Sequence, residues 1–420
     1  MELQLNKNKP LVMHIDLNSC FATVCQQAHI HLRGKPVVIA AYPTNNGCII
    51  SPSIEAKKLG IKVGMRVREA KLISKDVIVR ETDPMMVRDV HIKFKKIFQD
   101  YTPSVTPQSI DEAILDFAGM ESFLKRSLTD IAKEIKMRLR REIGEWISCS
   151  IGIGTNRFLA KTGASLKKPD GLELINYTRI EKVYEKLKLT DLNGINTRFE
   201  VRLNTQGIFT PLQFLSAPLP LLQKQVFQSI LGYYWFLRLR GYEIDNVEYS
   251  RKSFGQDYAL GKKTADVQEL SVILMKLCEK MGRRLRRAQY EALGLHIAFL
   301  YNDYTFWHKG KKGNTKLSST GDLYKGLLLL FHLQPEKKVV IKISVSCYDL
   351  IKKDNSQLDL FDENNNKKTK VSEALDKVND QYGEFTIIPA LMMESDNLAL
   401  DRIAFGGVKE LEDLYSHFED

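Results

Sequence analysis

Two acidic segments inside apolar runs constrain the fold of this chain most strongly. Residues 11–17 (LVMHIDL) are predicted to form a buried strand that carries Asp16 near its end, and SIDEAILDF places Asp111 and Glu112 between apolar residues. Buried carboxylates are costly unless they are paired or bind a metal ion. Neighbouring side chains of a regular strand point to opposite faces, so residues 111–112 must bend if both carboxylates are to face one ion.

Each of these acids also has a simpler explanation. An Asp at a strand end commonly caps a turn, and an Asp-Glu pair is commonly solvated at a hairpin. If the three carboxylates instead lie on neighbouring strands, their oxygens suit two Mg²⁺ ions. Two such ions, about 3.5–4 Å apart, stabilise the attacking and leaving oxygens of a phosphoryl displacement. Spacing alone leaves both interpretations open.

Composition narrows the class of protein. A net charge of +11 and a pI near 9.1 favour a polyanionic partner. The N-terminus lacks an apolar signal-peptide core, and no stretch approaches 18 apolar residues, so neither secretion nor a membrane partner is expected. The six cysteines form no C-x-x-C pair, which fits a reducing cytoplasm rather than a disulfide framework. A chain of 420 residues is too long for one core, and two to four domains are expected.

The first two parts of the chain differ in their predicted secondary structure. Strands mixed with covering helices make residues 1–175 an α+β unit. The following stretch, residues 178–245, shows short helical segments broken by glycine and proline, which predicts a compact all-α module. Within the first unit the pattern predicts strands at 37–41, 47–51 and 146–153, a strand-turn-strand over 104–118, and helices at 54–59, 85–100, 122–143 and 156–167.

Residues 253–350 are expected to form a third unit. A β-α-β-β-α-β order predicts a four-stranded sheet with two helices on one face. The pattern indicates a strand (253–260), a helix (264–288), a strand (290–301), a polar loop with Trp307, a helix (321–333) and a strand (337–348). A polar segment that begins QLDLFDENNNKKTK is expected to be flexible, and a helix-plus-strand stretch (371–406) follows it.

The order of these motifs resembles the Y-family translesion DNA polymerases. HIDLNSCFA and SIDEAILD match, as do CIISPSIEAKKLGIKVGM, SIGIGTNRFLAKTGASLKKPDG and RKSFGQDYAL, over roughly residues 10–350. The IEAKKLGIK stretch looks closer to the DNA polymerase V catalytic-subunit branch than to the DNA polymerase IV branch. The resemblance implies an α+β multidomain, right-hand polymerase with a mixed-sheet palm (1–22 and 80–177), small fingers (23–79), an all-α helix-hairpin-helix thumb (178–247), a little finger (248–352), a flexible clamp-binding segment (353–370) and an accessory tail (371–420).

The resemblance also implies the chemistry. Asp16, Asp111 and Glu112 match the catalytic metal ligands, with the carbonyl of Leu17 as a further contact, and the cofactor is two Mg²⁺ ions. A primer 3′-hydroxyl attacks the α-phosphate of a deoxynucleoside triphosphate, and positioning and charge neutralisation carry most of the catalysis. The remaining nucleotide contacts match Phe21 as the steric gate against ribonucleotides and Ser51, Lys57 and Lys168 at the triphosphate.

Contacts to larger partners follow in the same way. The turn at Gly194 resembles a helix-hairpin-helix that offers backbone N–H groups to phosphates of primer-template DNA. The basic helix end with Arg283, Arg284, Arg286 and Arg287, and the KGKKG stretch at 309–313, suit phosphate contacts or an ordinary solvated basic face. Gln357, Leu358, Leu360 and Phe361 resemble the bacterial Q-L-x-L-F peptide that binds the sliding clamp.

Three other functions are alternatives to an active polymerase. A catalytically inactive clamp- and DNA-binding paralogue, acting as a scaffold in damage tolerance, is disfavoured because all three carboxylates are present. A palm-type nucleotidyl cyclase lacks a thumb, a little finger and a clamp peptide. A purely structural nucleic-acid binder leaves the acids in apolar runs unexplained. Accessory damage-response subunits are an expected further partner if the chain follows the polymerase V branch.

Overall fold

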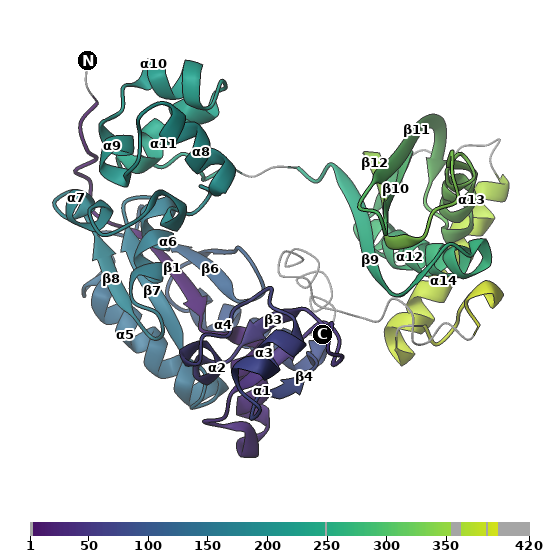
Figure 1. Ribbon diagram of the computed structural model, residues 1–420, viewed down its shortest axis with the longest axis horizontal. Coiled ribbons are helices and arrows are strands. Elements are labelled where there is room, and N and C mark those ends of the chain that lie inside the picture. The colour runs from purple at the N-terminus through teal and green to yellow at the C-terminus, as the bar shows by residue number, and fades with distance from the viewer. Residues whose placement is uncertain (1–2, 248–249, 354–362, 384, 394–420) are drawn as a thin grey trace. The chain divides into compact units, whose positions relative to one another are not determined.

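A computed structural model (Figure 1) describes residues 3–247, 250–353, 363–383 and 385–393, without the side chains of 363–366. Internal contacts divide these residues into two compact units, one ending at residue 247 and the other beginning at residue 250. Each unit contains its own hydrophobic clusters. The α+β class expected from the sequence is confirmed, with mixed sheets in the first unit.

A five-stranded mixed sheet in the order β5-β6-β1-β7-β8 is the centre of the first unit. The central strand β1 runs antiparallel to both β6 and β7, and all six of its residues are buried. Its register sets Asp16 opposite Glu112 on one side and Ser150 on the other. The strands are β1 (Val12–Leu17), β5 (Ser104–Pro107), β6 (Glu112–Asp116), β7 (Cys149–Gly154) and β8 (Leu172–Ile175).

Three helices accompany this sheet: α4 (Pro84–Gln99), α5 (Leu128–Arg138) and α6 (Arg157–Leu166). The helix expected over 85–100 is confirmed. The helix expected over 122–143 begins later, because the Ser127 side chain caps it by accepting a hydrogen bond from the backbone of Asp130. Helix α6 is capped by Asn156, as expected, and packs against β1, β7 and β8.

A smaller sheet, in the order β3-β2-β4, follows α1 in the chain. Strand β2 pairs antiparallel with β3 and parallel with β4, and the apolar side chains between this sheet and α2 and α3 form a separate cluster. The elements are α1 (Cys20–Ala28), β2 (Val37–Ala40), β3 (Ile49–Pro52), α2 (Ile54–Lys58), α3 (Val67–Ile73) and β4 (Ile78–Arg80).

Residues 176–247, all of which the structure describes, contain helices and no strand, as the sequence predicted. Their core surrounds Phe214, Phe227 and Trp235, and it includes Phe158 of α6, which meets the Trp235 ring edge-on at 5.5 Å. The helices are α7 (Ile180–Tyr184), α8 (Thr197–Thr205), α9 (Pro211–Ser216), α10 (Leu219–Leu221) and α11 (Leu231–Leu239).

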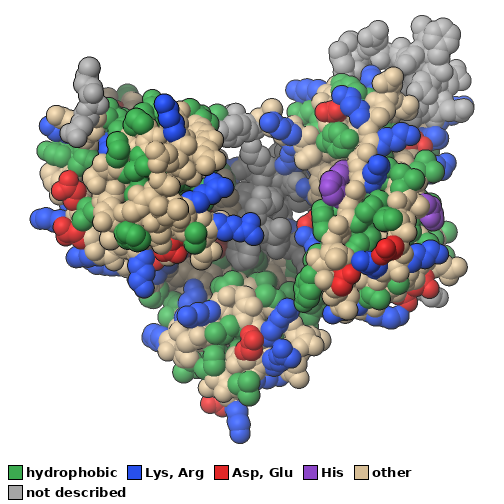
Figure 2. Space-filling view, turned by 45° about the horizontal axis from the view of Figure 1, so that its top comes forward, with side chains coloured by type: hydrophobic (Ala, Val, Ile, Leu, Met, Phe, Trp, Pro, Cys, Tyr) green, Lys and Arg blue, Asp and Glu red, His purple; other side chains and the backbone are tan. Residues whose placement is uncertain are grey.

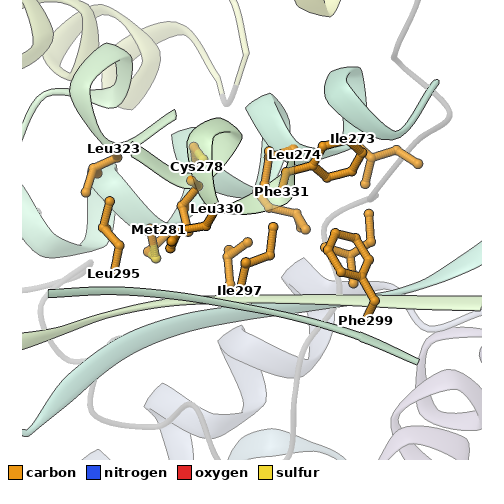
Figure 3. Packing of buried hydrophobic residues seen from close by; sticks show 14 of the residues in the cluster. Ile273, Leu274, Cys278, Met281, Leu295, Ile297, Phe299, Leu323, Leu330 and Phe331 are labelled. Carbon is orange, nitrogen blue, oxygen red and sulfur yellow. The ribbon is translucent and has the colours of Figure 1, made fainter. Parts of the chain in front are cut away.

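The second unit has an antiparallel four-stranded sheet in the order β11-β10-β12-β9. The chain order β9, α12, β10, β11, α13, β12 confirms the predicted β-α-β-β-α-β arrangement. Figure 3 shows side chains of α12 and α13, such as Met281 and Leu330, meeting Ile297 and Phe299 of the sheet. The elements are β9 (Ser253–Thr264), α12 (Val267–Arg287), β10 (Tyr290–Tyr301), β11 (Phe306–Leu317), α13 (Thr320–Phe331) and β12 (Val340–Lys352).

Two expectations for the second unit are wrong. The polar loop expected around Trp307 is the edge strand β11, whose residues are nearly all exposed and therefore show no apolar alternation. The chain expected to be flexible up to residue 370 is helical from Glu363, because helix α14 (Glu363–Tyr382) covers that range.

Candidate active site

The Asp16 carboxylate lies at the end of the buried strand β1 and is itself 9% exposed. Its Oδ2 is 2.5 Å from Nζ of Lys168. Burial raises the pKa of Asp16 to about 6, and the Lys168 ammonium acts in the opposite direction. An acid that keeps this environment despite its cost is a candidate for binding a cation.

Glu112, opposite Asp16 on β6, is held by a second lysine. Its Oε2 accepts a hydrogen bond from Nζ of Lys161 at 2.7 Å. Burial acts to raise the pKa of Glu112, but this hydrogen bond and nearby positive charges outweigh it and hold the pKa below its ordinary value. The two carboxylates are therefore each neutralised by an ammonium group from α6 or from the segment directly after it.

Asp111 precedes β6, where the chain is bent rather than extended. Its backbone carbonyl accepts a hydrogen bond from the N–H of Leu17, which fixes this bend beside β1. Burial raises the pKa of Asp111, and a 2.6 Å hydrogen bond from the Ser109 hydroxyl partly offsets the effect. The negative charge of Asp111 also raises the pKa of Asp16, which places the two groups in one electrostatic environment.

One side chain of this site, His14, was not predicted from the sequence. Ligand atoms of His14, Asp16 and Glu112 all lie within 4.8 Å of one another. His14 is 1% exposed, its Nε2 is 3.8 Å from Oε2 of Glu112, and neither ring nitrogen has a hydrogen-bond partner among the described residues. Burial lowers the pKa of His14 to about 4. The period-two alternation of β1 sets His14 and Asp16 on one face, and this signal was available in the sequence.

The predicted triphosphate contacts divide into two groups. The ammonium group of Lys168 pairs with the carboxylate of Asp16. Lys57 lies near this pair: burial lowers the pKa of Lys57, and the positive charge of Lys168 lowers it further. The negative charges of Asp16 and Asp111 act to raise the pKa of Lys57. Ser51 is buried on β3, two residues before Ser53, which caps the helix that carries Lys57. Phe21 is 2% exposed on α1, four residues after the end of β1.

The donor set fits a hard divalent cation. Carboxylate oxygens are the ligands that Mg²⁺ prefers, and His14 supplies a nitrogen that suits softer metals better. Each of the two buried carboxylates is paired with an ammonium group, and a divalent cation can replace that counter-charge when a lysine leaves. The residues present therefore fit metal binding by Asp16 and Glu112, and Asp111, which is adjacent to Glu112 and whose charge acts on Asp16, is a third candidate ligand.

The predicted DNA-contacting arginines of α12 have partners inside their own unit. Arg286 forms a two-point ion pair with Asp376 of α14, at 2.6 and 2.7 Å. Arg283 and Arg287 both pair with Asp380, and Nη1 of Arg284 donates to the carbonyl of Gly255 and to Gln256. A direct contact of these arginines with DNA stays a prediction.

Gly194 lies in a turn with φ of +100°, between a short 3₁₀ segment (Leu189–Asp191) and α8. This conformation favours glycine, and an added Cβ would meet the Trp235 ring at 3.2 Å. The predicted clamp-binding residues Gln357, Leu358, Leu360 and Phe361 lie outside the described residues.

The chain has 62 Lys and Arg residues against 51 Asp and Glu residues, a net charge of +11. Figure 2 shows Lys and Arg in excess over Asp and Glu on the visible face. None of the described helices has the length and the apolar character needed to cross a membrane.

Comparison with known proteins gives two matching family models. Residues 15–165 match the impB/mucB/samB family, and residues 251–360 match the C-terminal domain of the same family. The first region contains the three predicted metal ligands, and the second contains most of the second unit. The matched regions thus include the three predicted ligands and the four-stranded sheet.

Curated relatives are similar along nearly their full length. DNA polymerase IV of Pelotomaculum thermopropionicum is 30% identical over 397 residues, which cover 93% of this chain and 97% of that protein. DNA polymerase IV of Moorella thermoacetica is 32% identical, covering 91% and 96%, and DNA polymerase IV 1 of Bacillus subtilis is 29% identical, covering 89% and 91%. These relatives carry the polymerase IV name, so the expected closeness to the polymerase V branch stays a prediction.

Solved structures share the fold. The Y-family DNA polymerase chimera Dbh-Dpo4(243-245)-Dbh superposes with a TM-score of 0.72 at 24% identity, covering 81% of this chain and 99% of that one. The insertion ternary complex of Dbh DNA polymerase has the same coverage and identity with a TM-score of 0.58.

Proposed function

The chain belongs to the Y family of translesion DNA polymerases and is a DNA-directed DNA polymerase, and from this premise we propose that Asp16, Asp111 and Glu112 are its catalytic metal ligands. The observation that carries the proposal is the meeting of Asp16 and Glu112 at one register position of β1 and β6, each with a lysine as counter-charge. Two Mg²⁺ ions, when bound, supply charge stabilisation at the attacking and leaving oxygens. The carbonyl of Leu17, next to Asp16, is the proposed further ligand.

The lysines have two tasks in this proposal. In the protein alone, Lys161 and Lys168 neutralise Glu112 and Asp16, which lowers the cost of burying these acids. When metal and nucleotide bind, Lys168 leaves Asp16, and its ammonium group, together with that of Lys57, contacts the triphosphate. Ser51 is proposed to add a hydroxyl contact. Lysine provides a point charge that suits a phosphate oxygen without fixing its direction.

Phe21 is proposed to select the sugar. Its ring is buried in the first turn of α1, directly after the strand that carries Asp16. A rigid ring under the deoxyribose leaves no space for a 2′-hydroxyl, so a ribonucleotide meets a steric clash rather than a lost attraction. This steric exclusion acts on the sugar and does not depend on the identity of the base pair, which fits a polymerase that accepts damaged templates.

Primer-template DNA is proposed to bind through backbone contacts on both units. The Gly194 turn offers N–H groups in the first unit, and the exposed edge strand β11 offers Lys309, Lys311 and Lys312 in the second. Such contacts set the register of the duplex without reading its sequence. Recruitment by the sliding clamp through Gln357, Leu358, Leu360 and Phe361 completes the proposal.

Direct measurement of bound metal tests the site and separates an active polymerase from an inactive scaffold. Mn²⁺ is titrated, with detection of free Mn²⁺ by electron paramagnetic resonance, into protein bound to a dideoxy-terminated primer-template and the next complementary nucleotide. Wild type is expected to retain two ions, and Asp111→Asn at most one. Asp116→Asn, at the other end of β6, is the matched control and is expected to retain two. Retention of no ion by wild type, despite bound DNA, contradicts the proposed site and favours the scaffold.

A further inference from the structure

One side of helix α12 carries a continuous cationic stripe that does not face the sheet. Lys276, Lys280, Arg283 and Arg287 recur at intervals of four, three and four residues, which sets them on one helical face. Such a stripe is the electrostatic footprint of a surface that follows a phosphate backbone. In this chain, however, α14 and the described residues 385–393 lie against it.

The matching side of α14 is polar and acidic. Residues Thr369, Glu373, Asp376 and Asp380 follow helical spacing, and Asp376 is 9% exposed. Asp380 pairs with Arg283 and Arg287 of the stripe, and Glu373 pairs with Lys353 at 2.5 Å. Glu373, Asp376 and Asp380 thus form a row of carboxylates along one side of α14, comparable to the row of phosphates along a nucleic acid strand.

The contact is anchored in a buried position. Arg286, which is 5% exposed, binds both carboxylate oxygens of Asp376, and its Nη1 donates to the Ser318 carbonyl at 2.9 Å and to the Thr320 hydroxyl at 3.2 Å. One guanidinium therefore joins α12, the segment before α13, and α14. Fork-like pairing of this kind fixes geometry as well as charge.

The chain after α14 covers the remaining part of the stripe. Lys276 and Lys280 lie 4.9 and 5.6 Å from the centre of the Phe385 ring. The Asn379 side chain exchanges two hydrogen bonds with the backbone of Ile387, which turns the chain back. Met392, 1% exposed, then lies in the short helical turn (Ala390–Met392) that packs on α12. Figure 1 shows α14 in yellow-green beside α12.

We propose that residues 363–383 and 385–393 are an intramolecular cover of the cationic stripe, and that their carboxylates occupy positions that DNA phosphates would otherwise take. Both matched family regions end before α14, at residues 165 and 360, so the cover lies outside them. The cover lowers the non-specific affinity of the second unit for duplex DNA and leaves the sheet and β11 as its DNA-facing surface.

The test measures binding of the full-length protein to a labelled blunt DNA duplex across a range of KCl concentrations. Asp376→Asn/Asp380→Asn removes the ion pairs to Arg283, Arg286 and Arg287. Each arginine that gains a phosphate steepens the slope of log K against log salt by about 0.9, so the slope is expected to become more negative by about 2–3, with about tenfold tighter binding at low salt. Faster tryptic cleavage at the lysines of α14 reports whether the cover is released.

Two further variants keep the result interpretable. Asp303→Asn/Glu336→Gln makes the same change of net charge in the same unit and removes both ion pairs of Lys338, which does not lie on α12. Its slope is expected to stay within about one of wild type. Asp380→Asn alone keeps the buried Arg286 pair, so α14 stays docked and the slope changes by about 1–2 even if the double variant does not fold. An unchanged slope in Asp380→Asn, or a released cover with the wild-type slope, overturns the proposal.

Discussion

At the scale of single residues, the proposed role of Asp16 as a metal ligand lowers the stability of the metal-free protein. Its pKa of about 6 lies above the ordinary value near 3.8, because burial disfavours the ionised form more than Lys168 favours it. A raised pKa in the folded state means that the ionised carboxylate destabilises the metal-free protein at neutral pH. This cost falls as the pH drops below about 6 and disappears below about 4, where the carboxyl group is protonated in both states.

We therefore expect Asp16→Asn to stabilise the metal-free protein at pH 7.5, by up to about 3 kcal/mol, and to make little difference near pH 4. Thermal unfolding in the presence of a chelator, at several pH values, measures this. Asp116→Asn, on the same sheet but at the far end of β6, serves as the control for a generic loss of charge. A stabilisation that does not vary with pH contradicts the account.

Sequence reasoning identified part of this site. Asp16 and Glu112 stand out because they interrupt apolar runs, and the structure brings them to one register position. His14 was missed because a histidine in a buried strand has an ordinary apolar interpretation, although alternation along β1 places it beside Asp16. The position of Lys161 on Glu112 depends on how α6 packs across the sheet, which no local pattern encodes.

At the scale of elements, β11 shows where pattern reasoning fails. A strand covered on one face alternates apolar and polar residues, but an exposed edge strand contributes little to the core and needs no alternation. Lysines along such an edge also prevent pairing with another chain. Helix α14 begins earlier than the helix expected within 371–406, and a related reason hid its first turns: it is polar, and its described buried side chains are Asp376, which pairs with Arg286, and Asn379.

The same lysines give a test of the DNA-facing surface. Lys309→Gln/Lys311→Gln is expected to weaken binding of primer-template DNA and to make the salt dependence shallower by about 2, because each lysine contributes about 0.9 to the slope. Lys325→Gln/Lys337→Gln removes the same charge from exposed positions of the same unit, one of them on α13, and is expected to change the slope by less than about one. Fluorescence anisotropy over a series of salt concentrations distinguishes them, and equal effects would reject β11 as a contact surface.

At the scale of the whole molecule, the clamp-binding peptide is expected to determine recruitment but not chemistry. Leu360→Ala/Phe361→Ala is predicted to leave synthesis by the protein alone unchanged and to abolish its stimulation by a bacterial sliding clamp, because two apolar anchors are lost from the peptide. Asp359→Ala, at the variable position of the same peptide, is the matched control and is expected to keep the stimulation. Persistent stimulation of the double variant would refute the assignment.

The organisation into an α+β unit, a helical stretch and a β-α-β-β-α-β unit was predictable, because each has a distinct periodicity over many residues. The family membership was predictable for a different reason, since five motifs occur in one order. Beyond residue 360 the pattern predicted a helix within 371–406, but neither signal predicted what this helix contacts. There the structure depends on side-chain pairing between segments that are about 90 residues apart, such as Arg286 and Asp376.

We propose that this chain copies a template by means of the carboxylates of Asp16, Asp111 and Glu112. Primer extension on an undamaged template and on one with an abasic site, with Mg²⁺, tests it most directly when wild type is compared with Asp16→Ala/Asp111→Ala. We expect wild type to extend both primers, and the variant to bind primer-template DNA but add no nucleotide. Extension by the variant at the wild-type rate, or none by wild type despite tight DNA binding, would contradict the account.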